Sequence, residues 1–241
     1  MTMNVTILGS NGSYPGPSGA CSGFLVQSNQ VKIWLDAGPG TLSNLQNLIS
    51  MSELNAIIIS HKHADHSSDL QGFAVANSVV DPIEEPIAIY TPDGVGDDLE
   101  PGTDKCLIWN RVHDNDQIEI GDLSIKFSRT DHGPETLALR IDHEGKSFVY
   151  SSDTGPNWSL SKLGFGIDLA ICEATYLKDK EGQGRHLSAR QAAISAKQAG
   201  VRQLVLSHLW PTVDPNVALE EAKAEFGQNV SVAKMKENYH I

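Results

Sequence analysis

Short apolar runs separated by turn residues recur through the N-terminal part of the chain and predict β-strands. The first run leads into a loop rich in Gly, Ser and Pro (residues 9–19), and the second and third form a predicted hairpin that turns at Ser28 and Asn29. The last two runs are almost entirely apolar, which is typical of buried strands. These predicted strands occupy residues 5–8, 23–26, 32–35, 54–59 and 87–90.

The C-terminal part of the chain alternates between strand and helix patterns. Residues 122–128 have apolar side chains at every second position, as expected for a strand with one buried face. Glu144 and Gly145 mark the turn of a second predicted hairpin. The other strands predicted in this part occupy residues 137–141, 147–150, 168–171 and 203–207.

Three segments carry the signals of helix ends. Thr41, Ser188 and Asp214 are suited to cap the N-termini of helices, because their side-chain oxygens can accept from free backbone N–H groups. Gly200 and Gly227 are suited to end the second and third of these helices. The side chains predicted to face the interior include Leu42, Leu45, Leu48 and Ile49 in the first helix and Leu219, Ala222 and Phe226 in the last.

Strands interleaved with helices favour sheets covered by helices, which is a layered α/β arrangement. The chain of 241 residues suits one large α/β domain or two small ones. No internal repeat and no linker long enough to separate two domains is present in the sequence. We therefore expect a single domain that spans residues 1–241.

Composition and charge narrow the partners that we expect. No apolar stretch approaches the ~20 residues that span a bilayer, so we expect no membrane partner. A net charge of −12 without any Lys/Arg cluster disfavours a large nucleic acid, but not a small phosphate ester. The odd number of widely spaced cysteines and the lack of a signal peptide predict a cytoplasmic protein. A homodimer built on an apolar surface near the N-terminal loop is compatible with the sequence.

A dense cluster of metal-binding side chains follows the predicted strand at residues 54–59. Residues 61–66, His-Lys-His-Ala-Asp-His, place three imidazoles and a carboxylate close together. Imidazole and carboxylate are the ligands that hydrolytic metal centres use. Because a strand end holds such ligands on a rigid element and leaves them open to solvent, the cluster predicts a metal site rather than a polar loop.

Further candidate ligands or catalytic groups each follow a predicted strand. They are His132, Asp153, Glu173 and His208. If the strands lie in stacked sheets, their carboxyl ends can converge on one cleft. The histidines that we interpret instead as structural or exposed residues are His113, His143 and His240.

The motif at residues 61–66, followed by the later His, Asp and His, resembles the ligand pattern of metallo-β-lactamase-fold hydrolases. The resemblance implies a four-layer αβ/βα sandwich, with two mixed sheets flanked by helices and a site for two divalent ions at one edge. It also implies that Asp36 supports the histidine loop and that Asp153 bridges the ions, for which zinc, manganese or iron would be suitable. The other implied ligands are His61, His63 and His132 for one ion and Asp65, His66 and His208 for the other.

Two short motifs resemble those of the family's phosphodiesterase branch, which includes tRNA 3′-processing endonucleases. They are residues 173–175 (Glu-Ala-Thr) and 186–188 (His-Leu-Ser). In that branch the Glu orients the His, and the His stabilises charge on the phosphoryl group, so the resemblance implies that Glu173 and His186 are catalytic. Two departures are present: Cys172 replaces the first His of the branch's His-Glu-Ala-Thr motif, and a leucine separates His186 from the serine.

Only residues 133–152 lie between His132 and Asp153, and the second predicted hairpin fills them. A basic arm that grips tRNA has no room there, so the chain is more similar to compact bacterial cyclic-nucleotide phosphodiesterases. We expect hydrolysis of a small phosphodiester, most readily a cyclic nucleotide, by a hydroxide between the ions, with Asp65 as ligand and proton acceptor. The alternatives are a tRNA 3′-end endoribonuclease, a lactone or thioester hydrolase, and a metal-stabilised binding protein.

Overall fold

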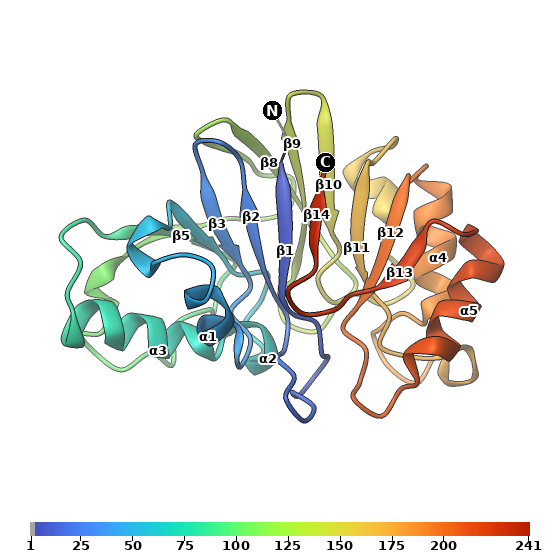
Figure 1. Cartoon of the computed structure of the whole chain (residues 1–241), viewed down its shortest axis with the longest axis horizontal. Helices are drawn as coiled ribbons and strands as arrows, with labels where there is room; N and C mark the ends of the chain where they lie inside the picture. Colours follow the sequence, from blue (N-terminus) through green and yellow to red (C-terminus); the bar gives the residue numbers. More distant parts are fainter. Residues whose placement is uncertain (1–2) are drawn as a thin grey trace.

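Two mixed sheets of seven strands each form the centre of the molecule in the computed structural model, which describes residues 3–241 (Figure 1). The first sheet consists, in spatial order, of β14 (Asn238–His240), β1 (Asn4–Gly9), β2 (Gly23–Gln27), β3 (Lys32–Leu35), β4 (Ala56–Ile58), β5 (Ile87–Thr91) and β6 (Leu107–Arg111). The second consists of β13 (Val230–Val232), β12 (Gln203–Ser207), β11 (Leu169–Glu173), β10 (Lys146–Tyr150), β9 (Leu137–His143), β8 (Leu123–Arg129) and β7 (Gln117–Ile120).

Helices cover the outer face of each sheet, so that the layers run helix, sheet, sheet, helix (Figure 1). The first sheet is covered by α1 (Thr41–Gln46) and α3 (Asp69–Val75), with α2 (Ala64–Ser67) at the lower edge in Figure 1. The second sheet is covered by α4 (Ala189–Gln198) and α5 (Pro215–Phe226). This arrangement confirms the four-layer αβ/βα sandwich that the sequence predicted.

Apolar side chains from both sheets fill the space between them. Val5, Phe24 and Ile33 of the first sheet belong to the same buried cluster as Phe127 and Phe148 of the second. Their burial follows from the alternation of each strand, because every second side chain points to the same face. Two further apolar clusters lie between each sheet and its helices. The sheets are therefore fixed relative to one another by a shared core.

Most predicted elements are confirmed, and the first helix is a partial exception. Ser188 accepts from the backbone N–H of Gln191, as the predicted capping role requires, and Asp214 caps α5 in the same way. Gly40 rather than Thr41 is the N-cap of α1, however, and the helix ends at Gln46. The prediction that Leu48 faces the interior is wrong, because this side chain lies beyond the helix and is 46% exposed.

Several strands run parallel in each sheet, so their C-terminal ends lie at one edge of that sheet. Strands β3 to β6 run parallel in the first sheet, and β10 to β13 run parallel in the second. Parallel strands end at the same edge of their sheet, so the loops that follow β4, β10, β11 and β12 gather there.

None of the helices in the described part of the chain is both long and apolar enough to cross a membrane.

Candidate metal centre

All seven predicted ligands lie together at this edge of the two sheets. The first sheet contributes the loop after β4 and the start of α2, and the second contributes the loops after β8, β10 and β12. The side chains fall into two groups that share Asp153. One group is His61, His63, His132 and Asp153, and the other is Asp65, His66, His208 and Asp153.

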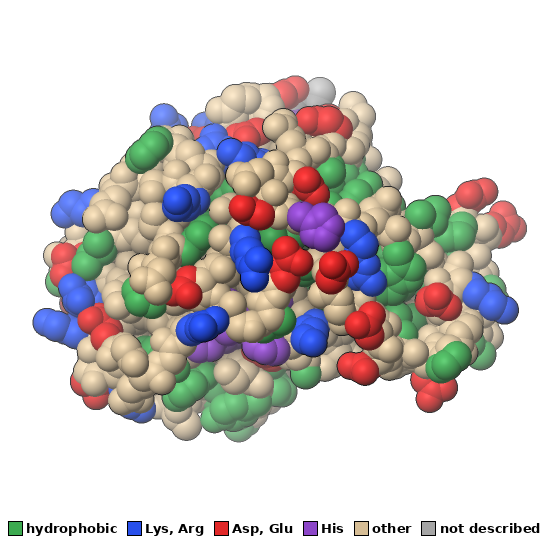
Figure 2. Space-filling model, turned by 180° about the vertical axis from the view of Figure 1, so that it is seen from behind, with side chains coloured by type: hydrophobic (Ala, Val, Ile, Leu, Met, Phe, Trp, Pro, Cys, Tyr) green, Lys and Arg blue, Asp and Glu red, His purple; other side chains and the backbone are tan. Residues whose placement is uncertain are grey.

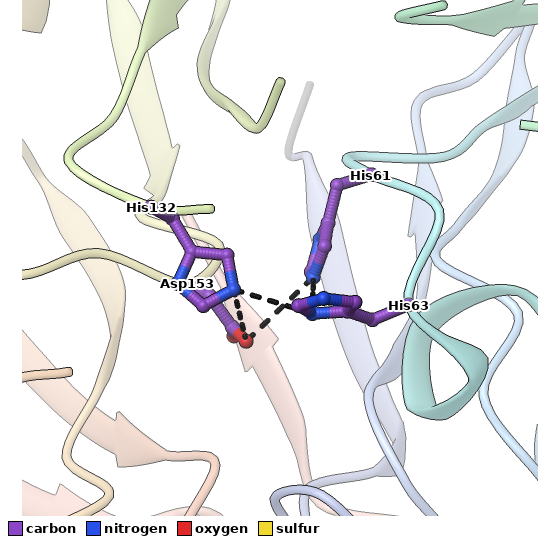
Figure 3. Close-up of side chains that lie close together, drawn as sticks. All are labelled: His61, His63, His132 and Asp153. Atoms are coloured by element: carbon purple, nitrogen blue, oxygen red, sulfur yellow. Dashed lines mark hydrogen bonds and ion pairs between the residues drawn. The ribbon is translucent and has the colours of Figure 1, made fainter. Parts of the chain in front are cut away.

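The first group points its ring nitrogens toward a common centre (Figure 3). Nδ1 of His63 lies 3.0 Å from Nε2 of His61 and 3.2 Å from Nε2 of His132. Oδ2 of Asp153 lies 3.7 Å from each of those two Nε2 atoms. A tetrahedral zinc ion with Zn–N distances of about 2.0–2.1 Å separates its ligand atoms by about 3.3 Å. These spacings therefore fit a divalent ion.

The second group is built around the other oxygen of the same carboxylate. Oδ1 of Asp153 lies 3.2 Å from Nε2 of His66 and 3.3 Å from Nε2 of His208. Oδ2 of Asp65 lies 3.1 Å from Nε2 of His208 and 3.6 Å from Nε2 of His66. Each oxygen of Asp153 thus faces a different set of ring nitrogens, as a bridging ligand would.

The buried polar atoms of the centre also fit a cation. Nε2 of His66 and Oδ1 of Asp153 are buried without a hydrogen-bond partner among residues 3–241, although such atoms are normally satisfied. Burial, reinforced by the neighbouring His66, lowers the pKa of His61 well below its usual range. Its imidazole is therefore neutral and offers a lone pair, as metal binding requires. The His/Asp clusters fit divalent metal ions.

Asp36 orients one of the proposed ligands from behind. Its Oδ2 lies 2.7 Å from Nδ1 of His66, which leaves Nε2 of that ring facing the centre. Ser60 donates to Asp36 from its backbone N–H (2.7 Å) and from its hydroxyl (2.9 Å). Tyr150 adds a third donor. The supporting role that the resemblance implied for Asp36 agrees with these contacts.

Hydroxyl and carbonyl groups contact the rings of His61 and His132. The hydroxyl of Ser60 lies 3.1 Å from Nδ1 of His61, and Ser152 donates to that hydroxyl over 2.7 Å. Nδ1 of His132 lies 3.1 Å from the carbonyl oxygen of Arg185. Each contact engages the nitrogen that faces away from the centre, so it selects the tautomer whose other nitrogen can bind a metal.

Glu173 links two histidines at the side of the centre. Its Oε1 lies 3.0 Å from Nδ1 of His186. Its Oε2 accepts from the hydroxyl of Thr175 (2.7 Å), and that hydroxyl lies 2.8 Å from Nδ1 of His208. Backbone N–H groups of Thr154 and Leu187 also donate to this carboxylate and hold it in place. One buried carboxylate therefore positions both imidazoles.

The surroundings of His186 favour the protonated form of its imidazole. Burial opposes protonation, but the Glu173 carboxylate and the more distant Asp153 raise the pKa of His186 to about 9. Nδ1 of His186 lies 4.0 Å from Oδ2 of Asp153, at the margin of the ligand cluster. A partly exposed imidazolium thus stands beside the centre, and it can stabilise developing negative charge or donate a proton.

The N-terminal loop closes the opposite side of the centre. The backbone N–H of Ser13 donates to Oδ2 of Asp65 over 2.8 Å, and Trp210 donates from its indole to the hydroxyl of Ser13. Burial works against ionisation of Asp65, but the hydrogen bond to His208 and the charge of His66 lower its pKa below its usual range. The carboxylate is therefore ionised, as a metal ligand must be.

Backbone strain is concentrated around the centre. Asp36, Ser152 and His208 have φ angles of 56°, 50° and 59°, in the left-handed region that non-glycine residues avoid. Each lies just past the end of β3, β10 or β12. Such conformations cost about 1–3 kcal/mol each and persist where the surroundings enforce them, often at functional sites.

The remaining histidines lie outside the centre. His143 is buried and pairs with Asp122 at 3.0 Å, whereas His113 is exposed and lies 3.8 Å from Glu135. His240 contacts Asn4 at the outer edge of the first sheet. These positions agree with their interpretation as structural or exposed residues.

Three residues that contact and orient the histidine rings were not predicted from the sequence to do so. Ser60, Ser152 and Thr175 act through hydroxyls that contact the outer nitrogens of histidines. Thr175 lies in the Glu-Ala-Thr motif, so a signal existed for it. The serines carry no comparable signal, because a serine after a strand is common and its partner is distant in sequence.

A sequence model of the Beta-lactamase superfamily domain matches residues 31–209. An uncharacterized protein of Mycobacterium tuberculosis is 32% identical over an alignment that covers 100% of this chain and 93% of that protein. Ribonuclease Z of Mycobacterium bovis is 29% identical, with 88% of each chain covered.

YhfI of Bacillus subtilis, which is named a probable metallo-hydrolase, is 30% identical, with 96% of this chain and 97% of that protein covered. The crystal structure of YhfI, a metallo-β-lactamase fold protein, matches this structure with a TM-score of 0.90, at 28% identity and over 100% of both chains. Similarity therefore extends over the whole fold and includes the segments that carry the candidate centre.

Proposed function

Because the chain belongs to the β-lactamase superfamily of metal-dependent hydrolases, we propose that it hydrolyses a small phosphodiester, most readily a cyclic nucleotide, at a centre of two divalent ions. One observation carries the proposal: His186, held by Glu173, stands beside Asp153 without belonging to either group of proposed ligands. A phosphodiester gains charge on several oxygens as its bond breaks, so a positioned imidazolium next to the ions suits this reaction.

The proposed ligands divide between the ions as the two groups do, with Asp153 common to both. Divalent ions held there would lower the pKa of an attacking water and neutralise phosphoryl oxygens. Imidazole and carboxylate ligands suit zinc, and they suit manganese or iron nearly as well. Asp65 is proposed as a ligand and as the acceptor of the proton from the attacking water.

The chain's own residues would handle the leaving group. Glu173 accepts the Nδ1 proton of His186, which leaves Nε2 of His186 free to face the substrate. The imidazolium would bind a phosphoryl oxygen and donate its Nε2 proton to the leaving oxygen as the ester bond breaks. Thr175 connects the same carboxylate to His208, so the proton donor and a metal ligand share one support.

A tRNA 3′-end endoribonuclease is the second candidate, and the similarity to ribonuclease Z favours it. The interval between His132 and Asp153 is occupied by β9 and β10, which leaves no arm to grip tRNA. The net charge is −12. On the face that Figure 2 shows, which is the one turned away in Figure 1, basic side chains are interspersed with acidic ones rather than gathered in a patch. A small substrate fits these features better, because polyanion binding relies on clustered cations.

The proposal is tested by assaying the metal-loaded protein on 3′,5′- and 2′,3′-cyclic nucleotides, linear dinucleotides, pre-tRNA and a lactone in parallel. We expect turnover of cyclic nucleotides and little cleavage of pre-tRNA. Salt-sensitive cleavage of pre-tRNA without cyclic nucleotide turnover would favour the endoribonuclease. Lactone or thioester turnover that does not need His186 would favour that class of hydrolase. Protein that holds metal but cleaves no ester would instead indicate a binding protein.

A cytoplasmic location is also part of the proposal. Cys21, Cys106 and Cys172 are all free and buried, which agrees with a reducing cytoplasm. Burial raises the pKa of Cys172 to about 12, so this thiol is inert beside the catalytic Glu173. A homodimer stays a prediction.

A further inference from the structure

Two loops pair with each other beside the proposed centre. The N-terminal loop follows β1, and the loop at residues 208–214 follows β12; both protrude past the lower edge of the sheets in Figure 1. The backbone N–H of Gly12 donates to the carbonyl oxygen of Leu209 over 3.0 Å, and the indole of Trp210 donates to the hydroxyl of Ser13 over 3.0 Å. The N-terminal loop therefore holds Trp210 in place.

Trp210 is also close to the second group of proposed ligands. The backbone N–H of Ser13 donates to Oδ2 of Asp65 over 2.8 Å. Because the N and Oγ atoms of one serine are at most about 4 Å apart, Nε1 of Trp210 lies within about 10 Å of that carboxylate oxygen. In a nucleotide, one ribose ring separates the phosphate from the base, which is a span of this order. A base can thus reach the indole while its phosphate is at the proposed centre.

Tyr176 connects Trp210 to the other side of the centre. Its ring packs edge-to-face, at 90°, against Trp210 with centroids 5.2 Å apart and against His186 with centroids 5.8 Å apart. Its backbone N–H donates to the carbonyl oxygen of Leu187, which ties it to the segment that carries His186. Trp210 is therefore anchored from both sides of the centre.

The ring of Trp210 remains partly open to solvent. Tyr176 is buried, with 5% of its surface exposed, whereas Trp210 is half-buried. An indole that is held by a hydrogen bond and by an edge-to-face contact loses little conformational freedom when another ring stacks on it. Stacking of this kind accepts any base, because every base has a π-face.

We propose that Trp210 stacks on the base of the substrate, so that the enzyme recognises the nucleobase of a cyclic nucleotide by its π-face. This inference rests on the proposed function. Such a contact needs no hydrogen-bonding edge, so adenine and guanine should be accepted alike, and purines, which cover more of an indole, should be preferred over pyrimidines. The proposed ions and His186 act on the phosphodiester, whereas Trp210 binds the part of the substrate that does not react.

The test compares the metal-loaded protein on 3′,5′-cyclic AMP and on the 3′,5′-cyclic phosphate of methyl riboside, which has the same reacting group but no base. The ratio of the two kcat/KM values isolates the contribution of the base, because a disturbance of the centre affects both esters. We expect Trp210→Leu to lower this ratio about tenfold and Trp210→Phe, which keeps a ring, to lower it about threefold.

Two control variants separate stacking from a structural role. Ser13→Ala removes the same hydrogen bond between the loops but keeps the indole, so the ratio should stay at the wild-type value. Phe165→Leu replaces a ring that is 69% exposed and precedes β11 instead of following it, and it should also preserve the ratio. A fall in Ser13→Ala as large as that in Trp210→Leu would show that Trp210 only anchors the loop, and would overturn the inference.

Calorimetric titration of the metal-loaded protein with 5′-AMP and with ribose 5-phosphate gives a readout that does not depend on turnover. We expect the wild type to bind 5′-AMP about tenfold more tightly, and Trp210→Leu to bind both about equally. A ratio and a difference in affinity that survive Trp210→Leu would overturn the stacking role and leave the proposed function intact. No turnover of either ester, together with a preference for 5′-AMP that depends on Trp210, would contradict the proposed function and support the contact with the base.

Discussion

The hydroxyl of Tyr150 donates a 2.8 Å hydrogen bond to Oδ2 of Asp36, and this bond joins the two sheets beneath the proposed centre. Tyr150 ends β10 in the second sheet, and Asp36 follows β3 in the first. The same oxygen lies 2.7 Å from Nδ1 of His66. A contact between the sheets thus helps to orient a proposed metal ligand.

Tyr150→Phe removes this bond and leaves the ring in the core. Because a hydrogen bond to a charged group contributes more than a neutral one, we expect the free energy of unfolding to fall by about 2 kcal/mol. Urea denaturation of the metal-free protein measures the loss. Tyr90→Phe, in the first sheet, is the control, and equal losses in both variants would contradict a special role for the Asp36 contact.

Asp153→Ala removes the carboxylate that faces both groups of histidines. We expect the purified variant to lose at least one metal ion per chain, because each group loses an oxygen ligand. Elemental analysis of protein loaded with zinc measures the occupancy. Glu119→Ala removes an exposed carboxylate on β7 and should leave the metal content unchanged. Full occupancy by two ions in the Asp153 variant would rule out a bridging role.

His186→Ala should separate metal binding from catalysis. His186 is outside both groups of proposed ligands, so we expect the variant to keep its metal while phosphodiesterase turnover falls by about 10²- to 10⁴-fold. Hydrolysis of bis-p-nitrophenyl phosphate and elemental analysis on the same sample measure the two properties. His113→Ala, a change at an exposed histidine outside both groups of proposed ligands, should affect neither. Turnover at the wild-type rate would refute the role of His186.

The pH profile should report the charge on His186. Glu173 raises its pKa from 6.5 to about 9 against the effect of burial, so the imidazolium is present at neutral pH and is lost as the pH rises through that value. We therefore expect kcat/KM to decline on the alkaline side. Glu173→Gln removes the charge that favours protonation and should move this decline to lower pH. An alkaline limb that stays in place would contradict the pairing.

Gly12 lies against His208, and the contact leaves no space for a side chain. A Cβ at this position would come within 2.3 Å of the His208 carbonyl oxygen and 2.6 Å of its Nδ1. We expect Gly12→Ala to displace the ring, to lower metal occupancy and to cost about 1–3 kcal/mol of stability. Gly133→Ala is the matched control, because a Cβ there meets nothing within 4 Å. Similar metal content in both variants would contradict this.

The sequence predicted the inner strands well and the outer ones poorly. Strands such as β4 and β12 are nearly continuous apolar runs, so their pattern alone identifies them. Strand β14 has only three residues, of which Tyr239 is the buried one, and it forms because β1 offers backbone partners. Strand β6 exposes Ile108, which breaks the expected alternation. Edge strands depend on tertiary pairing, which a local pattern does not contain.

The proposed ligands could be identified from the sequence because histidines and carboxylates follow several apolar strands in the order that metallo-β-lactamase-fold hydrolases show. Their supports could not, since they are hydroxyls and backbone groups brought in from distant segments. Ser152 reaches Ser60 across 92 positions of the chain, and Ser13 reaches Asp65 across 52. Such contacts arise from how the sheets stack, so they become visible only in three dimensions.

Each group of proposed ligands draws on both halves of the sandwich, with His61 and His63 facing His132, and His66 facing His208. Ions bound there would link the two halves and stabilise the folded state, so the melting temperature would rise with the concentration of free metal by mass action. A cell short of metal would then lose folded enzyme to proteolysis as well as catalytic rate, which couples the abundance of this protein to metal supply.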